Sequence, residues 1–145
     1  MRRLLLPLLL IAAACASSSG NRPADIAKPS ILIRQSGSFF FGSSPSAPIS
    51  LDVTVTNNAN VPLRVREIEV GSTGMMQYAV EPSKKIFNEI LAPGESRTMG
   101  LTSTVRARSA RIPSMEPLSV QAVIRFEANG RGFREIVTHQ FAGSS

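Results

Sequence analysis

The chain has 145 residues, the length of one domain, and its hydrophobic content of 43% is that of a folded protein rather than a disordered one. Its 16 basic and 10 acidic residues give a net charge of +6, which suits an acidic neighbourhood such as anionic lipid or cell-wall polymer. A charge of this size, without a dense basic stripe, argues against a nucleic-acid partner.

The N-terminus has the layout of a secretory signal peptide. Arg2 and Arg3 form a short positive region, and the apolar stretch from Leu4 to Ala14 follows it. This stretch is too short to cross a hydrocarbon core as a helix, which takes about 20 residues. We therefore predict that residues 1–14 are the signal peptide of an exported protein.

Cys15 is the one cysteine of the chain and comes directly after the apolar stretch. The sequence Ala12-Ala13-Ala14-Cys15 resembles the bacterial lipobox, in which a peptidase cleaves before a diacylated cysteine. The alternative is an ordinary signal peptide with an Ala-x-Ala cleavage site and a free thiol. Lipidation is favoured because an unpaired thiol is a liability in an oxidising compartment.

A lipidated Cys15 would hold the chain permanently at a membrane, because acyl chains such as palmitate bury many methylene groups at about 0.8 kcal/mol each. The next residue is Ala16 rather than Asp. The resemblance to Gram-negative lipoproteins then implies the outer membrane, on its periplasmic side.

Residues 15–29 are rich in serine, glycine, asparagine and proline, which keep a chain flexible and block regular structure. We predict that this segment is the lipidated cysteine followed by a flexible tether. Such a tether would carry the domain on the order of tens of ångströms from the bilayer.

From Ser30 onward the hydrophobic pattern has period two, which indicates half-buried β-strands. The expected strands lie near residues 31–34, 49–56, 63–70, 76–80, 86–90, 99–105, 118–126 and 133–141. The pattern changes parity between Val65 and Ile68, which predicts a β-bulge near Arg66 and Glu67. We therefore predict one all-β domain over residues 30–143, an immunoglobulin- or fibronectin-III-like antiparallel β-sandwich of about seven strands.

The last two strands carry the strongest local signal. Asn129-Gly130 favours a two-residue type I′ turn, whose positions both need positive φ. This turn sets Phe126 opposite Phe133 on the core face and Arg125 opposite Arg134 on the other face. The second pair is a mild conflict, since like charges directly opposite are destabilising.

The order of features from Ile31 to Val105 resembles the LEA14-type domain, also called LEA-2 or the water-stress and hypersensitive-response domain. The resemblance rests on a short strand, a long alternating strand, the turn Asn57-Asn58-Ala59-Asn60 and the turn Leu91-Ala92-Pro93-Gly94-Glu95-Ser96. The central proline of the family's Asn-Pro-Asn turn is missing here. The resemblance implies a fibronectin-III-like fold, a stress-response setting and no known catalytic residues.

The residues that could perform catalysis are few. His139 is the one histidine, and its parity on the last strand matches Val137 and Phe141, which suits a histidine at the sheet edge or in a satisfied hydrogen bond. With Cys15 lipidated, no Cys/His cluster is left to hold a metal ion, and the carboxylates are not spaced as in a calcium loop. We therefore predict a protein that is not an enzyme and has no metal or cofactor.

Two other features could form a binding surface. Six arginines lie on predicted strand faces: Arg64, Arg66, Arg106, Arg108, Arg125 and Arg134. If they converge, they could bind phosphate or carboxylate groups, but they could equally be solvated faces that protect strand edges from aggregation. Phe39-Phe40-Phe41 cannot all face one core, so one of them covers a loop or forms an exposed apolar patch.

We expect a membrane-anchored envelope lipoprotein whose sandwich is a non-catalytic binding or structural module, LEA14-like. Its partners would be the membrane, through the lipid on Cys15, and an envelope protein or cell-wall polymer. The alternative is a carrier of lipid or another apolar ligand, which needs a cavity between the two sheets. An enzyme would need a polar cleft around His139.

Overall fold

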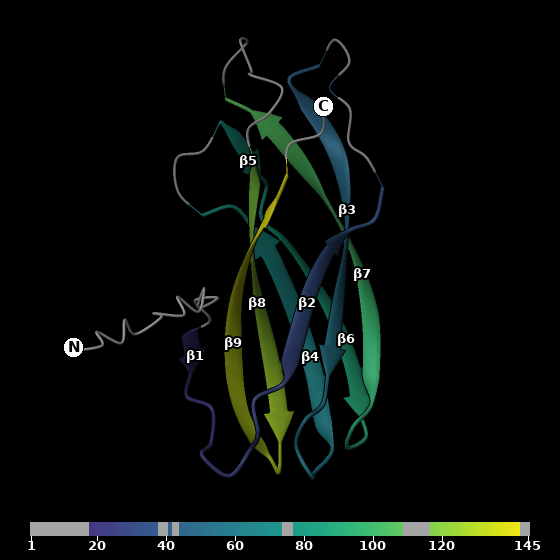
Figure 1. The fold of residues 1–145 in the computed structure, drawn as a ribbon, viewed down its shortest axis with the longest axis vertical. Coiled ribbons are helices and arrows are strands. Elements are labelled where there is room, and N and C mark those ends of the chain that lie inside the picture. The colour runs from purple at the N-terminus through teal and green to yellow at the C-terminus, as the bar shows by residue number, and fades with distance from the viewer. Residues whose placement is uncertain (1–17, 38–40, 42–43, 74–76, 109–116, 143–145) are drawn as a thin grey trace, which may run out of the picture.

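The computed structural model describes residues 18–37, 41, 44–73, 77–108 and 117–142. The predicted signal peptide, Cys15, Phe39 and Phe40 lie outside the described residues. The strands, drawn in Figure 1, are β1 (Ser18–Gly20), β2 (Ser30–Gln35), β3 (Ser46–Thr56), β4 (Leu63–Gly71), β5 (Tyr78–Val80), β6 (Ser83–Leu91), β7 (Ser96–Ala107), β8 (Leu118–Ala128) and β9 (Arg131–Phe141). In the described part of the chain, no helix is long and apolar enough to cross a membrane.

These strands form two antiparallel sheets packed as a sandwich (Figure 1). The five-stranded sheet has the order β1-β9-β8-β4-β6, and the four-stranded sheet has the order β2-β3-β7-β5. Without the short strands β1 and β5, three strands (β2-β3-β7) face four (β9-β8-β4-β6), which is a fibronectin-III-like arrangement. The prediction of an antiparallel sandwich of about seven strands is confirmed.

The core lies between the sheets because alternate residues of each strand point inward. In β3, for example, Ile49, Leu51, Val53 and Val55 are all at most 2% exposed, as the period-two pattern predicts. The partners that meet them from the other strands include Ile33, Leu63, Val65, Ile68, Leu101, Val105, Val120, Ile124 and Phe126. Apolar side chains therefore occupy the space between the sheets.

The predicted bulge is present in β4. The pairing of β4 shifts register between Val65 and Glu67, both against β8 and against β6. Because one extra residue is inserted, Val65 and Ile68 both lie in the core. Arg66 and Glu67 are consecutive, and both side chains lie along one groove on the outer face of the five-stranded sheet.

The predicted β8–β9 hairpin is confirmed in register and in turn geometry. Phe126 pairs with Phe133, and Arg125 pairs with Arg134. Asn129 and Gly130 have φ values of 51° and 70°, as the turn requires. The rings of Phe126 and Phe133 stack with their centroids 5.3 Å apart.

The N-terminal segment, residues 18–29, differs from the predicted flexible tether. β1 pairs with β9, and the chain then passes around the bottom of the sandwich to reach β2 (Figure 1). Ile26 is 1% exposed and belongs to the core. The prediction of a flexible tether is therefore wrong for these residues. The burial of Ile26 is the physical reason, because removing its side chain from water stabilises a docked segment by about 2 kcal/mol.

Candidate functional site

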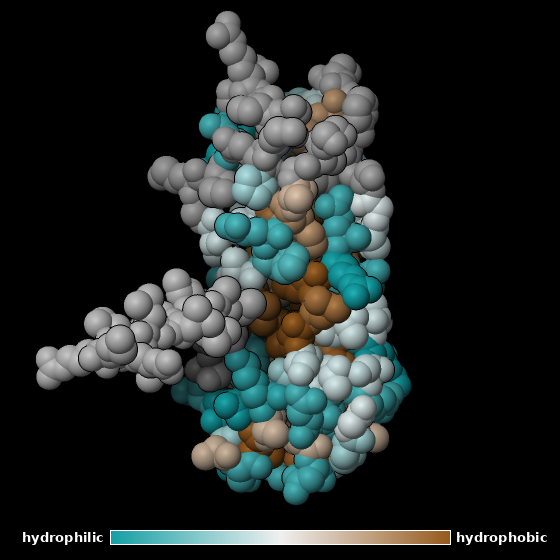
Figure 2. All heavy atoms as spheres, viewed as in Figure 1, coloured by the Kyte–Doolittle hydropathy of each residue, from teal (hydrophilic) through white to brown (hydrophobic). Residues whose placement is uncertain are grey.

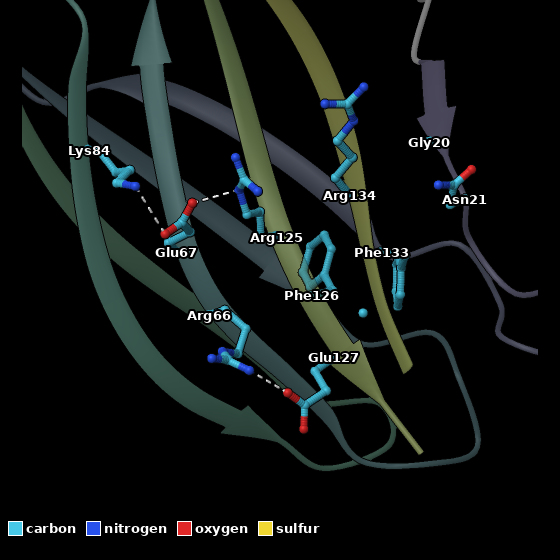
Figure 3. A pocket seen from close by; sticks show the side chains of 11 residues that line it. Gly20, Asn21, Arg66, Glu67, Lys84, Arg125, Phe126, Glu127, Phe133 and Arg134 are labelled. Carbon is cyan, nitrogen blue, oxygen red and sulfur yellow. Dashed lines mark hydrogen bonds and ion pairs between the residues drawn. The ribbon is translucent and has the colours of Figure 1, made fainter. Parts of the chain in front are cut away.

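A groove of about 740 Å³ crosses the outer face of the five-stranded sheet. It runs over β9, β8 and β4, with β6 at one side and the end of β1 at the other (Figure 3). Six charged side chains line it, from Arg66, Glu67, Lys84, Arg125, Glu127 and Arg134. Four of these are basic and two are acidic, so the groove has a surplus of positive charge.

One row of residues spans the groove from strand to strand. Gly20 of β1 pairs with Arg134 of β9, and Arg134 pairs with Arg125 of β8. Arg125 in turn pairs with Glu67 of β4. Directly opposed residues on neighbouring strands have Cβ atoms about 4.5–5.5 Å apart, so these side chains are close neighbours on one face.

Both carboxylates of the groove are in ion pairs. Glu67 contacts Arg125 at 2.6 Å through one oxygen and Lys84 at 3.4 Å through the other. Glu127 accepts a hydrogen bond of 2.6 Å from Arg66 (Figure 3). The acidic residues of the groove are therefore neutralised by side chains on neighbouring strands.

Arg134 is the basic residue of the groove that these pairs leave out. Among the described residues it forms no ion pair, and its nearest charged neighbour across the strand is Arg125. Its side chain lies over Gly20, where a Cβ atom would come within 2.9 Å of the Arg134 Nε atom. The absence of a side chain at residue 20 therefore leaves room for this guanidinium.

The wall of the groove beside β9 is the N-terminal segment, and an ion pair buried at its inner side fastens it. Glu135 of β9 is 0% exposed, and its Oε1 atom lies 3.2 Å from Nε of Arg22, whose side chain is 25% exposed. The geometry falls short of a hydrogen bond, and neither carboxylate oxygen has a hydrogen-bond partner among the described residues. Arg22 also donates a hydrogen bond of 2.5 Å to the Ile26 carbonyl oxygen.

A second, exposed ion pair ties the same segment to the β8–β9 turn. Arg131 donates a hydrogen bond of 2.5 Å to Asp25. This hydrogen bond is the main reason that the pKa of Asp25 lies below its ordinary value of 3.8. The N-terminal segment is thus held by the β1–β9 pairing, by the ion pairs of Arg22 and Asp25, and by the buried side chain of Ile26. Gly20 and Asn21 line the groove as a consequence.

The structure brings together three of the six arginines that the sequence singled out. Arg66, Arg125 and Arg134 line the groove, whereas Arg64 lies on β4 outside it. Arg106, in the other sheet, donates two hydrogen bonds to Glu81, and Arg108 follows the end of β7. The hairpin register predicted that Arg125 and Arg134 meet. Glu67 and Lys84 were missed because the β4–β8 and β4–β6 pairings have no comparable turn signal.

The other candidate residues lie away from this groove. His139 is exposed on β9, with its ring at the edge of Phe141 and the centroids 4.7 Å apart. No cluster of histidine, cysteine or carboxylate side chains that could hold a metal ion occurs in the described ranges. Phe41 packs against the core and stacks on Tyr78, with the ring centroids 5.6 Å apart.

Apolar surface is also present outside the residues that line the groove. Figure 2 shows an apolar area near the middle of the view, between β9 and β2, surrounded by hydrophilic side chains. On β6, Ile86 and Ile90 are 65% and 51% exposed. The groove is therefore distinguished from these areas by its charge.

Comparison with known proteins supports the fold alone. No family model and no curated protein matches the chain. It is similar to the X-ray structure of the structural genomics target SoR45, with a TM-score of 0.56 and 7% identity over 81% of this chain and 86% of that one. A protein from Archaeoglobus fulgidus matches with a TM-score of 0.46 and 9% identity over 83% of this chain and 97% of that one. A FixG-related protein from Vibrio parahaemolyticus matches with a TM-score of 0.39 and 12% identity over 83% of this chain and all of that one.

Proposed function

We propose that this chain is an exported lipoprotein, anchored through Cys15, whose sandwich is a non-catalytic module that binds an envelope partner close to the membrane. The observation that carries the proposal is the docking of the N-terminal segment on the sandwich. The outer membrane, on its periplasmic side, is the proposed location. The LEA14-type resemblance agrees with this role and stays a prediction.

The docked segment shortens the distance between anchor and domain. β1 begins at Ser18, three residues after Cys15. Three residues span at most about 11 Å when extended, so a lipid on Cys15 would keep the sandwich next to the bilayer. This position differs from that of a domain at the end of a long tether, and it directs the search for partners to the membrane surface.

A binding role is supported by how the charges of the groove are arranged. The acidic side chains that line it are already paired with basic ones, which does not suit a general base. The basic surplus suits an acidic partner. The proposal of an apolar-ligand carrier has less support, because apolar side chains occupy the space between the sheets and the groove lies outside it.

Metabolic labelling with palmitate tests the anchoring. The wild-type chain should incorporate the label and fractionate with the outer membrane, whereas Cys15→Ser should do neither. A His139→Ala chain is the matched control and should be labelled like the wild type. An unlabelled wild-type chain that fractionates with the soluble periplasm would overturn the anchoring.

Chemical crosslinking in intact cells tests the binding role. A partner that the wild type captures, and that Cys15→Ser captures less, would be an envelope component near the membrane. Equal capture by the two chains would contradict a role that depends on membrane position.

A further inference from the structure

We propose that the opposed pair Arg125 and Arg134 is a binding site for a phosphate group. The inference deepens the proposed binding role by naming the ligand class, and it rests on that role but not on lipidation. The register of the β8–β9 hairpin pairs Arg125 directly with Arg134, and both side chains line the groove on the outer face. Like charges directly opposite each other on neighbouring strands are destabilising, so an anion bound between the two side chains would offset this repulsion.

The two arginines differ in what else they contact. Arg125 is held at one side by Glu67, 2.6 Å from its Nε atom, and Glu67 is also shared with Lys84. Arg134 forms no ion pair among the described residues, and its Nε atom would lie 2.9 Å from a Cβ atom at residue 20. The site is therefore one oriented guanidinium beside one whose charge is uncompensated.

A phosphate group suits this pair better than a carboxylate. The three terminal oxygens of a phosphate can accept hydrogen bonds from two guanidinium groups at once, and arginine forms bidentate pairs with phosphate. A carboxylate has two oxygens, so after a bidentate pair with one guanidinium it offers fewer acceptor sites to a second than a phosphate does. Of the two arginines, Glu67 contacts Arg125 only, and no carboxylate of the described residues pairs with Arg134. A phosphate that bridges the two arginines is therefore the better match.

The site lies beside the N-terminal segment. Gly20 and Asn21 line the groove, and Gly20 is five residues after Cys15, a chain length of at most about 18 Å. A phospholipid headgroup is thus one source of the phosphate, and a soluble phosphate ester is the other. The headgroup and the ester both present a phosphate group to the two arginines, and binding experiments with a probe of each kind distinguish them.

The test uses the full chain in maltoside micelles, with inorganic phosphate and a soluble short-chain phosphatidylglycerol as probes at constant ionic strength. Saturable shifts of the ¹H–¹⁵N resonances of Gly20, Arg125 and Arg134 are expected with phosphate. Arg134→Gln should raise the phosphate dissociation constant about tenfold, because it removes a charge-assisted hydrogen-bonding group. Arg134→Lys keeps the charge but loses the planar guanidinium group, so its phosphate dissociation constant should lie between those of the wild type and Arg134→Gln.

The matched control is Arg108→Gln, which removes an exposed charge outside the groove and should leave phosphate binding unchanged. Tighter binding of the phospholipid probe than of phosphate, with the same loss in Arg134→Gln, would assign a headgroup as the source. Binding of phosphate alone would assign a soluble ester. Shifts that do not saturate, or an equal effect of Arg108→Gln and Arg134→Gln, would overturn the site whether or not Cys15 carries lipid.

Discussion

At the residue scale, the burial of Glu135 is costly, because a charge removed from water must be paired. Its side chain is fully shielded from water between Phe133 and Val137 on the inward face of β9, and Arg22 is the cation beside it. Breaking a buried pair by removing one partner is strongly destabilising, because the remaining charge has no counter-ion. Replacing both partners by apolar residues is often neutral.

We expect Arg22→Met to lower the free energy of unfolding by about 3 kcal/mol, because it leaves Glu135 buried and unpaired. The double variant Arg22→Met with Glu135→Leu should return to within about 1 kcal/mol of the wild type. Urea denaturation of the three chains measures both. The exposed pair of Arg106 and Glu81 supplies the control, since Arg106→Met should cost less than about 1 kcal/mol. A double variant as unstable as the single one would show that Arg22 acts through packing rather than charge.

Glu135 also marks how far single residues could be predicted from the sequence. Its parity matches Phe133 and Val137, so the alternating pattern alone places it inside. Its partner Arg22 could not be predicted, because it lies far away in the sequence, in a segment whose composition favours flexibility. The same is true of Gly20 and Glu67, whose places beside Arg134 and Arg125 depend on strand pairings without a local signal.

At the scale of elements, short turns were predictable and long-range docking was not. Asn129-Gly130 predicted the β8–β9 hairpin with its register, and the parity change predicted the bulge in β4. In the N-terminal segment, serine, glycine and proline outnumber the one aliphatic residue that becomes buried, Ile26. A composition average therefore hides the single side chain that determines whether this segment docks.

The hairpin turn provides a direct test of backbone strain. Gly130 has a φ of 70° and open space around its Cα, so Gly130→Ala should destabilise the fold by about 1 kcal/mol through the backbone alone. Gly132 lies two residues further on, where an added Cβ would make only ordinary contact with the Phe126 carbonyl oxygen at 3.8 Å. Gly132→Ala should therefore cost nothing or stabilise slightly. Equal losses in urea denaturation of the two variants would contradict this assignment of the turn.

The ion pair between Asp25 and Arg131 predicts a dependence on pH. Because the pKa of Asp25 is lowered in the folded chain, the pair stabilises the fold fully above pH 3.8 and loses this effect as the pH falls through the lower, folded value. Arg131→Gln should therefore be less stable than the wild type near neutral pH, and the two should converge well below pH 3.8. Denaturation midpoints measured across this range give the result. A difference that does not change with pH would show that Arg131 stabilises the turn in another way.

At the scale of the whole molecule, the docked segment limits how far the sandwich could lie from the proposed lipid anchor on Cys15. A chain that extended freely from residue 15 to residue 29 would let the sandwich move well away from its anchor. With β1 paired to β9, the chain is attached to the sandwich from Ser18 onward. With the proposed lipid on Cys15, the edge of the five-stranded sheet and the groove beside it would lie nearest the bilayer.

An inserted linker tests this arrangement. Ten glycine and serine residues placed between Ser17 and Ser18 would add a flexible spacer with an average span of about 17 Å, without changing the docked segment. Energy transfer from a dye on the sandwich to an acceptor lipid should be high in the wild type and should fall clearly with this insertion. The control is an insertion of the same ten residues in the β8–β9 turn, between Asn129 and Gly130. It lengthens the chain without changing the segment between Cys15 and the sandwich. Equal transfer in the wild type and in the N-terminal insertion would mean that the sandwich is already free of the membrane surface, and the N-terminal segment would then stabilise the fold without positioning it.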